Sequence, residues 1–314
     1  METERLTADD AGIARAAEML EAGELVAFPT ETVYGLGGLA SRSDSVRKIF
    51  AAKGRPADRP VIVHLADALA AQGWAAELTE DGRLLAEQFW PGPLTLIVPR
   101  SSKVPDVVTG GRETVGLRVP SHRVALNLLA AVGDGVAAPS ANRYGHISPT
   151  TAEHVLADLD GRIAAVIDGG PCQVGIESTI VEVLPAVGDG AASVSILRQG
   201  GVSARAIESV LGRPITDGSS GRGEYARAPG MVLSHYAPTA PLAVVPAIEA
   251  DAAPDGVIVI RMDSGESDQE FARALYARLR AADRQAPTEI WIVPPESGEM
   301  LPAILDRLTR AAHR

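Results

Sequence analysis

Apolar positions along the chain follow two spacings, and each predicts a different element. Between residues 7 and 23, Ile13, Ala16 and Leu20 recur at the three-to-four-residue spacing of a helix. Gly23 then supplies a stop signal for that helix. The next run, residues 25–28, is continuously apolar and ends at Pro29, which predicts a short buried strand.

The same two spacings continue along the chain to residue 211. Further strands are predicted over residues 61–63, 94–98, 115–119, 135–138, 164–167, 175–183 and 194–197. Further helices are predicted over residues 43–50, 79–89, 123–132, 151–159 and 203–211. Strands separated by helices, with several strands ending in polar, glycine-rich segments, predict an α/β fold built on a sizeable sheet.

The pattern changes after residue 212, where glycine, serine and later proline dominate. This composition predicts a linker over residues 213–241, and His235 and Tyr236 within it offer a titratable group and an aromatic ring. A plain spacer is the alternative interpretation. Regular patterns return as strands over residues 242–245, 257–260 and 289–293 and helices over 268–281 and 300–312. We therefore expect a first domain at residues 1–212, the linker, and a small β/α accessory domain at residues 242–314.

Composition narrows the class of protein. With 46% hydrophobic residues among 314, the chain has enough apolar side chains for a large core. A net charge of −11 argues against a broad nucleic-acid-binding surface. The single cysteine excludes an internal disulfide and a cysteine-based zinc cluster. No apolar run approaches the ~20 residues of a membrane span, and the polar first residues do not resemble a secretory signal, so we expect a cytoplasmic protein.

The segment PTETVYGLG, residues 29–37, concentrates polar chemistry at a strand end. Thr30, Glu31, Thr32 and Tyr34 directly follow the apolar strand, and glycines come next. Glycine allows a ligand to approach the backbone closely. The segment is thus a candidate floor for a small polar ligand, although an ordinary polar turn would have the same composition.

Cations in two segments suggest an anionic ligand. Lys53, Arg55 and Arg59 alternate with glycine and prolines, so they lie on a rigid loop and could hold a phosphate chain. A solvated basic turn is the alternative. Arg118 lies in an apolar, strand-like stretch, where a cation must be paired or must hold an anionic ligand.

The common nucleotide and hydrolase motifs are absent: there is no GxxxxGK[ST] loop, GxGxxG fingerprint, HExxH or GxSxG. What remains is a set of loops rich in Thr, Ser, Asn, Arg and Lys at strand ends. This chemistry suits an amino-acid-like ligand together with a phosphate compound.

Several segments, taken in order, resemble one known family. These are PTETVYGLG, KGRP with PVIVH, WPGPLT, VGLRVP, PSAN with SPT, GIESTIV and ILRQGG. Together they resemble the YrdC-like family over about residues 8–245. The PGM…HYAP linker and the small C-terminal part resemble the two-domain form of that family, the threonylcarbamoyl-AMP synthases.

The resemblance implies a fold and a reaction. The fold would be a twisted, mostly parallel α/β sheet with a large, open, positively charged cavity, plus a small Rossmann-like C-terminal domain, with the linker closing over the cavity. The reaction would join L-threonine, bicarbonate or CO₂, and ATP into L-threonylcarbamoyl-AMP with release of pyrophosphate. ATP implies Mg²⁺ as its companion ion, without a protein-held metal site. The product would pass to the machinery that makes threonylcarbamoyladenosine in tRNA.

The resemblance also assigns roles to individual residues. L-Threonine would be held by Thr32, His64, Arg118, the backbone of Ala138, and Ser178. ATP would be held by Arg55, Arg59, Thr114, Ser140, Ser148, Arg198 and Tyr236. The family's catalytic K-x-R…S-x-N set would be Lys53, Arg55, Ser140 and Asn142.

Two other functions are compatible with the same cavity. One is a non-catalytic accessory protein that binds double-stranded RNA. The other is carbamoyl transfer of the kind performed by hydrogenase-maturation proteins, which carry additional domains that this chain lacks.

Overall fold

The computed structural model describes residues 2–186, 192–218 and 236–313. The strands are Glu4–Thr7 (β1), Val26–Phe28 (β2), Gly35–Leu39 (β3), Ile62–His64 (β4), Leu94–Pro99 (β5), Thr114–Arg118 (β6), Val136–Ala137 (β7), Ala165–Asp168 (β8), Thr179–Leu184 (β9), Ser193–Arg198 (β10), Thr216–Asp217 (β11), Leu242–Val244 (β12), Val257–Ile260 (β13) and Glu289–Ile292 (β14). The helices are Asp10–Glu21 (α1), Ser43–Lys53 (α2), Glu80–Phe89 (α3), Asp106–Thr109 (α4), Arg123–Val132 (α5), Ala152–Leu159 (α6), Ala204–Leu211 (α7), Ala247–Ala250 (α8), Asp268–Asp283 (α9) and Leu301–Ala312 (α10), with a short 3₁₀ helix at Leu69–Gly73.

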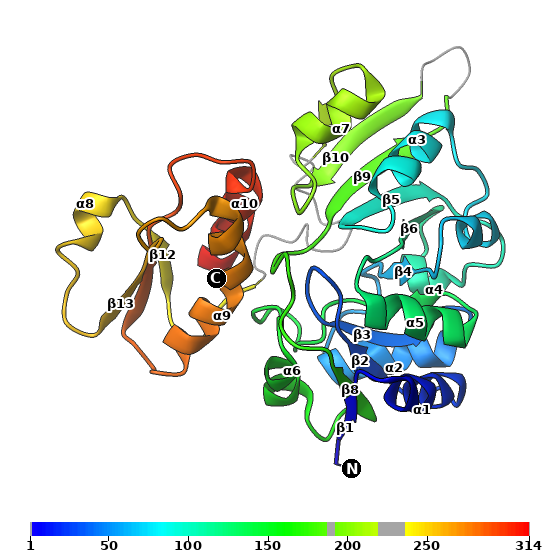
Figure 1. The fold of residues 1–314 in the computed structure, drawn as a ribbon, viewed down its shortest axis with the longest axis horizontal. Helices are drawn as coiled ribbons and strands as arrows, with labels where there is room; N and C mark the ends of the chain where they lie inside the picture. The colour runs from blue at the N-terminus through cyan, green and yellow to red at the C-terminus, as the bar shows by residue number, and fades with distance from the viewer. Residues whose placement is uncertain (1, 187–191, 219–235, 314) are drawn as a thin grey trace.

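The strands form two sheets (Figure 1). The described part of the large sheet has the order β1-β8-β2-β3-β7-β4-β6-β5-β9-β10-β11, and the small sheet has the order β12-β14-β13. The large sheet contains both parallel pairs, such as β2–β8, β4–β6 and β5–β9, and antiparallel pairs, such as β2–β3, β4–β7 and β5–β6. Both pairings of the small sheet are parallel. The predicted α/β class with a second, smaller sheet is confirmed.

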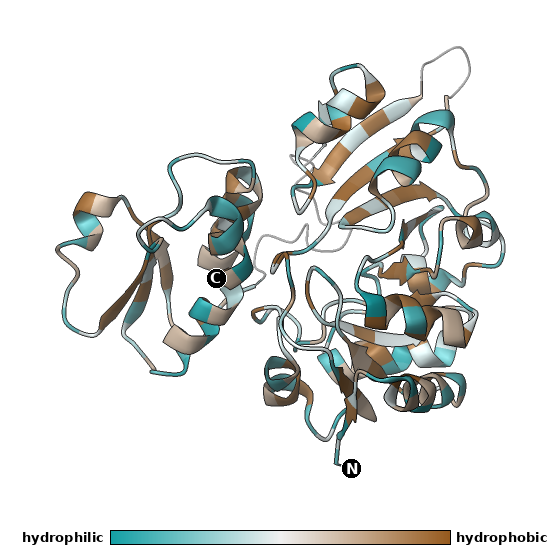
Figure 2. Ribbon diagram, viewed as in Figure 1, coloured by the Kyte–Doolittle hydropathy of each residue, from teal (hydrophilic) through white to brown (hydrophobic). Residues whose placement is uncertain are grey.

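Several helices begin at a residue whose side chain caps the first turn. The side chains of Asp9, Thr79, Thr151, Ser203 and Ser267 each accept a hydrogen bond from a backbone N–H in the first turn of α1, α3, α6, α7 and α9. Apolar faces then turn inward, so that the strands are mostly hydrophobic and the helices two-sided (Figure 2). The predicted helices and strands in the described residues match these elements to within a few residues.

Three strands lie where the sequence predicts none. β1 has three exposed residues of four, so it lacks an apolar run. β3 is glycine-rich because it is crowded: a Cβ on Gly37 would lie 2.9 Å from Phe28 Cε1 and 3.0 Å from Val136 Cγ1. β11 lies inside the predicted linker and pairs with β10. Residues 219–235 of the linker lie outside the described residues, and the predicted domain boundaries remain predictions.

The strand predicted over residues 175–183 begins four residues late. Gly175 has φ +78°, a left-handed conformation that a regular strand does not contain, and β9 starts only at Thr179. The intervening residues therefore form an irregular segment. This segment carries two side chains that matter below, Glu177 and Ser178.

The two sheets are joined through α9 and α10, which lie on the side of the small sheet that faces the large one (Figure 1). Gly175 packs directly against α9: a Cβ built on it would be 2.4 Å from Arg273 Cα. An ion pair between Arg280 of α9 and Asp158 of α6, 2.8 Å long, also crosses this interface. Within the described residues, no helix combines the length and apolar character needed to cross a membrane.

Candidate active site

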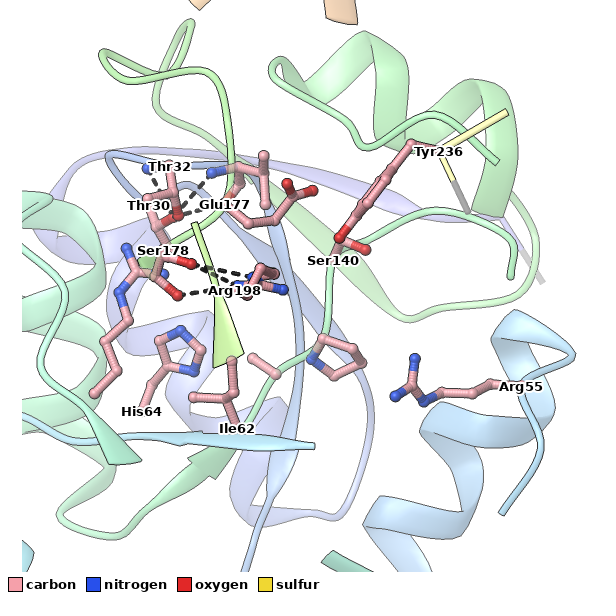
Figure 3. Close-up of a pocket in the computed structure, with 15 residues that line it drawn as sticks. Thr30, Thr32, Arg55, Ile62, His64, Ser140, Glu177, Ser178, Arg198 and Tyr236 are labelled. Atoms are coloured by element: carbon pink, nitrogen blue, oxygen red, sulfur yellow. Dashed lines mark hydrogen bonds between the residues drawn. The ribbon is translucent and has the colours of Figure 1, made fainter. Parts of the chain in front are cut away.

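One pocket collects polar side chains from the ends of several strands of the large sheet (Figure 3). All five residues predicted to hold threonine line it: Thr32, His64, Arg118, Ala138 and Ser178. Four of the seven residues predicted to hold ATP line it as well: Arg55, Ser140, Arg198 and Tyr236. Thr30, Thr32, Ser178 and His64 gather on one side, and Arg55 and Tyr236 lie on the other (Figure 3).

The segment after β2 forms the hydroxyl-rich wall of the pocket. Thr30 Oγ1 lies 2.8 Å from Thr32 Oγ1 and donates to the carbonyl oxygen of Val33 at 2.6 Å. These local bonds close a tight turn, which places the Thr32 side chain in the pocket. The predicted ligand floor is thus a structured turn.

Arg118 ends β6 with its guanidinium group buried. Its NH2 lies 2.7 Å from Glu31 Oε1, and both side chains are 4% exposed. Its Nε donates to the carbonyl oxygen of Gly92 at 3.2 Å. Glu31 is fixed in turn by the backbone N–H of Ser121, 3.1 Å from Oε2. The cation that the sequence requires to be paired is therefore paired, and its orientation is set from two sides.

His64 ends β4 and lies beside Arg118 in the β4–β6 register. Burial, reinforced by the positive charge of Arg118, lowers the pKa of His64 to about 3. Its ring is therefore neutral near pH 7. Such a weakly basic imidazole can orient a ligand by hydrogen bonding but is a poor proton acceptor.

Ala138 contributes its backbone at the end of β7. Its N–H donates to the carbonyl oxygen of Ile62 at 2.9 Å. A ligand that contacts the Ala138 backbone would therefore meet the carbonyl oxygen, which accepts hydrogen bonds.

Two arginines project into the pocket from different elements. Arg198, at the end of β10, donates from Nε and NH2 to the carbonyl oxygen of Ser178 at 3.1 and 2.8 Å. Arg55, just after α2, donates from NH2 to the carbonyl oxygen of Pro60 at 2.9 Å and lies over the ring of Tyr144. Burial lowers the pKa of Arg55 to about 10, so this guanidinium group is charged at neutral pH, and burial also lowers the pKa of Arg198.

Five other predicted residues do not line this pocket. Lys53 is 3% exposed, and its Nζ donates to the carbonyl oxygens of Ser140 and Asn142, beneath the loop. Burial, with repulsion from Arg55, lowers the pKa of Lys53 well below its ordinary value. The Asn142 amide donates to the carbonyl oxygen of His146 at 2.7 Å. Both side chains thus support the loop that carries Ser140.

The remaining three are dispersed. The Ser148 hydroxyl is buried and donates to Glu177 Oε1 at 2.6 Å. Arg59 is partly exposed, and its Nε lies 3.9 Å from Asp58 Oδ1. Thr114 starts β6, whereas Arg118 ends it, so the two lie at opposite ends of one strand.

Glu177 lines the pocket and was not predicted from the sequence. Burial opposes its ionisation, but Arg307, Arg198 and the Ser148 hydroxyl outweigh that effect and lower the pKa of Glu177 to about 2. Among the described residues, no group of three or more His, Cys, Asp or Glu side chains is placed to hold a metal ion. Because the Glu177 oxygens are already engaged, this pocket does not fit a protein-held metal.

Comparison with known families places the chain. Residues 18–200 match the model of the Sua5/YciO/YrdC family, which carries the description "Telomere recombination". The chain belongs to this family. Residues 202–313 match a second model, described as "Threonylcarbamoyl-AMP synthase, C-terminal domain". The predicted two-domain form of the YrdC-like family is therefore confirmed.

Individual relatives agree with this assignment. The threonylcarbamoyl-AMP synthase of Bacillus subtilis is 47% identical over 77% of this chain and 69% of its own length. That of Pyrococcus abyssi is 40% identical over 95% of this chain and 93% of its own length. The crystal structure of P. abyssi Sua5 complexed with L-threonine superposes with a TM-score of 0.90, at 37% identity, over 99% of this chain and 98% of its own.

Sequence reasoning missed Ile62, Pro139 and Glu177 as lining residues, and it named Thr30, Val33 and Gly35 only as part of the candidate ligand floor at residues 29–37. Thr30 belongs to the predicted polar segment, so its position signalled a role. Glu177 stands in a stretch that has the pattern of a strand. Its partners lie 99 and 130 residues further along the chain, and no local pattern points to them.

Proposed function

We propose that this chain makes L-threonylcarbamoyl-AMP and pyrophosphate from L-threonine, bicarbonate or CO₂, and ATP. One observation carries the proposal: the predicted threonine residues and four of the seven predicted ATP residues line a single pocket. Arg55 and Tyr236 lie across it from Thr32 and His64, and Arg198 contacts Ser178 (Figure 3). The similarity to a threonine-bound structure supports threonine as a substrate. The names of the relatives support the synthase activity.

The threonine subsite is proposed at the wall formed by Thr32, His64, Arg118, Ala138 and Ser178. Arg118 pairs with the threonine carboxylate, since it lies beside His64 in this wall and is held in place by Glu31. The Ala138 carbonyl oxygen accepts from the threonine amine. Neutral His64 and the hydroxyls of Thr32 and Ser178 orient the rest of the molecule.

The ATP subsite is proposed across the pocket. Arg55 and Arg198 bind the phosphates, Ser140 donates to a phosphate oxygen, and Tyr236 packs against the nucleotide. Arg59, Thr114 and Ser148 remain proposed ATP contacts, and because they do not line the pocket they require the nucleotide to extend beyond it. The Mg²⁺ that accompanies ATP would be carried by the phosphate oxygens.

The reaction then needs positioning and charge rather than a protein nucleophile. The threonine nitrogen forms a bond to the carbon of CO₂ and loses a proton, giving a carbamate. A carbamate oxygen attacks the α-phosphorus, the bond from that phosphorus to the bridging oxygen breaks, and pyrophosphate leaves. The enzyme is thus a nucleotidyltransferase. Arg55 and Arg198 neutralise the charge that develops on the phosphates.

Lys53 and Asn142 are proposed to serve this step through the Ser140 loop. The Nζ of Lys53 donates to two of the loop's carbonyl oxygens and so fixes the loop. The catalytic set proposed from the family pattern therefore divides into Arg55 and Ser140, which line the pocket, and Lys53 and Asn142, which support it.

We also propose a cellular partner and location for the protein and a division of the chain into domains. The product is unstable in water, so a tRNA-modification enzyme that accepts it must act directly afterwards, and a cytoplasmic location suits both. The division into residues 1–212, 213–241 and 242–314, with the linker closing over the pocket, belongs to the same proposal. The relatives named above give no support to the alternative of an RNA-binding accessory protein.

Pyrophosphate release tests the proposal directly. Purified protein is given MgATP and bicarbonate, with and without L-threonine, and D-threonine serves as the matched control. We expect release that depends on L-threonine, together with a carbamoylated adenylate detected by mass spectrometry. Release that is indifferent to threonine, or no release, would overturn the proposed activity.

A further inference from the structure

Glu177 presents a problem for an anion-binding pocket, because it places a carboxylate on the wall. An uncompensated negative charge there would repel a triphosphate. Arg198 and the Ser148 hydroxyl offset part of this charge, and two side chains of the C-terminal part of the chain contact the carboxylate directly. Tyr276 of α9 donates its hydroxyl to Glu177 Oε2 at 2.9 Å, and Arg307 of α10 donates from Nε to the same oxygen at 2.7 Å.

Arg307 is built into this position. It is 1% exposed, and its NH1 is held by Asp306 in the same helix. Burial acts against its charge, but the nearby Glu177 carboxylate raises the pKa of Arg307 well above its ordinary value. A buried arginine and a buried carboxylate in contact form a pair with no net charge at neutral pH.

The Tyr236 ring packs against Tyr276 and Arg307, two residues that also contact Glu177. It stacks on Tyr276 with centroids 5.9 Å apart, and the Arg307 guanidinium carbon lies 5.4 Å from its centroid. Tyr236 is 1% exposed and lines the pocket (Figure 3). The C-terminal helices therefore hold both the carboxylate and the aromatic ring on this side of the pocket.

We infer that Arg307 is a positioning residue for the anionic ligand: it neutralises and orients Glu177, so that the pocket accepts phosphates only when the C-terminal helix α10 is in place. The inference rests on the proposed function where it names the ligand as ATP. Among the two ion pairs described across this interface, only the one between Arg307 and Glu177 reaches the pocket. Arg280, which also crosses the interface, pairs with Asp158, and neither residue lines the pocket.

The charge argument predicts a pattern in a double-mutant cycle of the full-length chain. MgATP and L-threonine are titrated calorimetrically into wild type, R307M, E177Q and E177Q/R307M, with R280M as the matched control. We expect R307M to lower the affinity for MgATP at least tenfold, while the affinity for L-threonine changes less than threefold. The MgATP affinity of E177Q/R307M should equal that of E177Q, because the double variant has no unpaired carboxylate at position 177. R280M binds both ligands as wild type does.

The pH profile separates charge from shape. Glu177 is faced by Ser148, Tyr276 and Arg307, with Arg198 nearby, and Asp306 and Tyr236 lie next to Arg307. Without Arg307 the buried carboxylate becomes easier to protonate, and protonation removes the repulsion. The MgATP affinity of R307M, relative to wild type, should therefore recover as the pH falls from 8 to 5.5. E177Q/R307M should show no such recovery.

The outcomes are distinct for the inference and for the proposed function. If R307M loses affinity for MgATP and for L-threonine equally, and the added E177Q change does not restore MgATP binding, then Arg307 has only a structural role and the inference is overturned. If wild type binds no ATP, the proposed function fails, and inorganic pyrophosphate replaces it as the probe in the same cycle. The same order of affinities for pyrophosphate would support the inference alone, and no binding of pyrophosphate would overturn it too.

Discussion

Arg118 and Glu31 face each other across 2.7 Å in the interior, each 4% exposed, at the wall of the ligand pocket. A pair of this kind contributes little when intact but is costly to break, because the surviving charge loses its partner. Its function here is to hold one guanidinium in a defined orientation.

Arg118→Ala should weaken threonine binding far more than ATP binding. The variant loses the cation for the threonine carboxylate and leaves Glu31 to repel it, so we expect a loss of about 100-fold or more for threonine. MgATP affinity should change less than threefold. Calorimetric titration of each ligand checks this, and equal loss of both would contradict the assignment of Arg118.

The same substitution should destabilise the fold. A buried carboxylate without its partner costs about 3–5 kcal/mol of the free energy of unfolding. The double variant with Glu31→Gln should recover a substantial part of that loss in urea denaturation. If the double variant were less stable than Arg118→Ala alone, the ion pair would not be the cause.

Lys53 distinguishes a supporting role from a direct one. Lys53→Met leaves the carbonyl oxygens of Ser140 and Asn142 without their donor, so the free energy of unfolding should fall by about 2–3 kcal/mol. Lys48→Met, at a half-exposed lysine in the same helix, should change it by less than about 0.5 kcal/mol. A Lys53 variant with unchanged stability and lost activity would instead favour direct contact with the phosphates.

His64 should make stability depend on pH. Its pKa is about 3 in the folded chain and near its ordinary value when unfolded, so the unfolded state binds the proton first as the pH falls. Stability is therefore lost on going below about pH 6.5, by about 2 kcal/mol between pH 6.5 and 4.5. His64→Gln should lack this part of the slope. Urea midpoints at several pH values measure it, and parallel curves for the two proteins would refute it.

Tyr236→Ala should lower the yield of product. The ring is buried over the pocket, and its loss admits water to a carbamate that hydrolyses readily. We expect the ratio of threonylcarbamoyl-AMP to ATP consumed to fall severalfold, with Tyr236→Phe close to wild type because the ring remains. An unchanged ratio in the alanine variant would reject a water-excluding role.

The sequence predicted what local patterns can encode. The helices predicted over residues 79–89, 151–159 and 203–211 and the apolar runs of β5, β8 and β13 each appear in the structure. β3 was missed because its glycines answer a packing demand from Phe28 and Val136, which lie on neighbouring strands. Apolar runs in the sequence indicate buried strands, but packing contacts between strands that are distant in sequence produce no local pattern.

The candidate site divides in the same way. Thr32, Arg118 and Ser178 were found through polar residues placed at strand ends and through the family resemblance. The Glu31–Arg118 pairing was not foreseen, since two residues 87 positions apart meet only after β2 and β6 have joined one sheet. Glu177 was missed because its role depends on Arg307, which reaches it only when the two sheets have docked.

The docking itself has almost no tolerance. Where Gly175 meets Arg273 of α9, even one added methyl group would overlap the helix backbone. Two residues away stands Glu177, so a side chain at position 175 would act as a wedge that lifts α9, and with it Tyr276, from the pocket wall. Substitutions at this interface are therefore compatible with the fold only if Gly175 and α9 remain in direct contact. A single added carbon atom at position 175 would be enough to separate α9 and α10 from the pocket that they help to form.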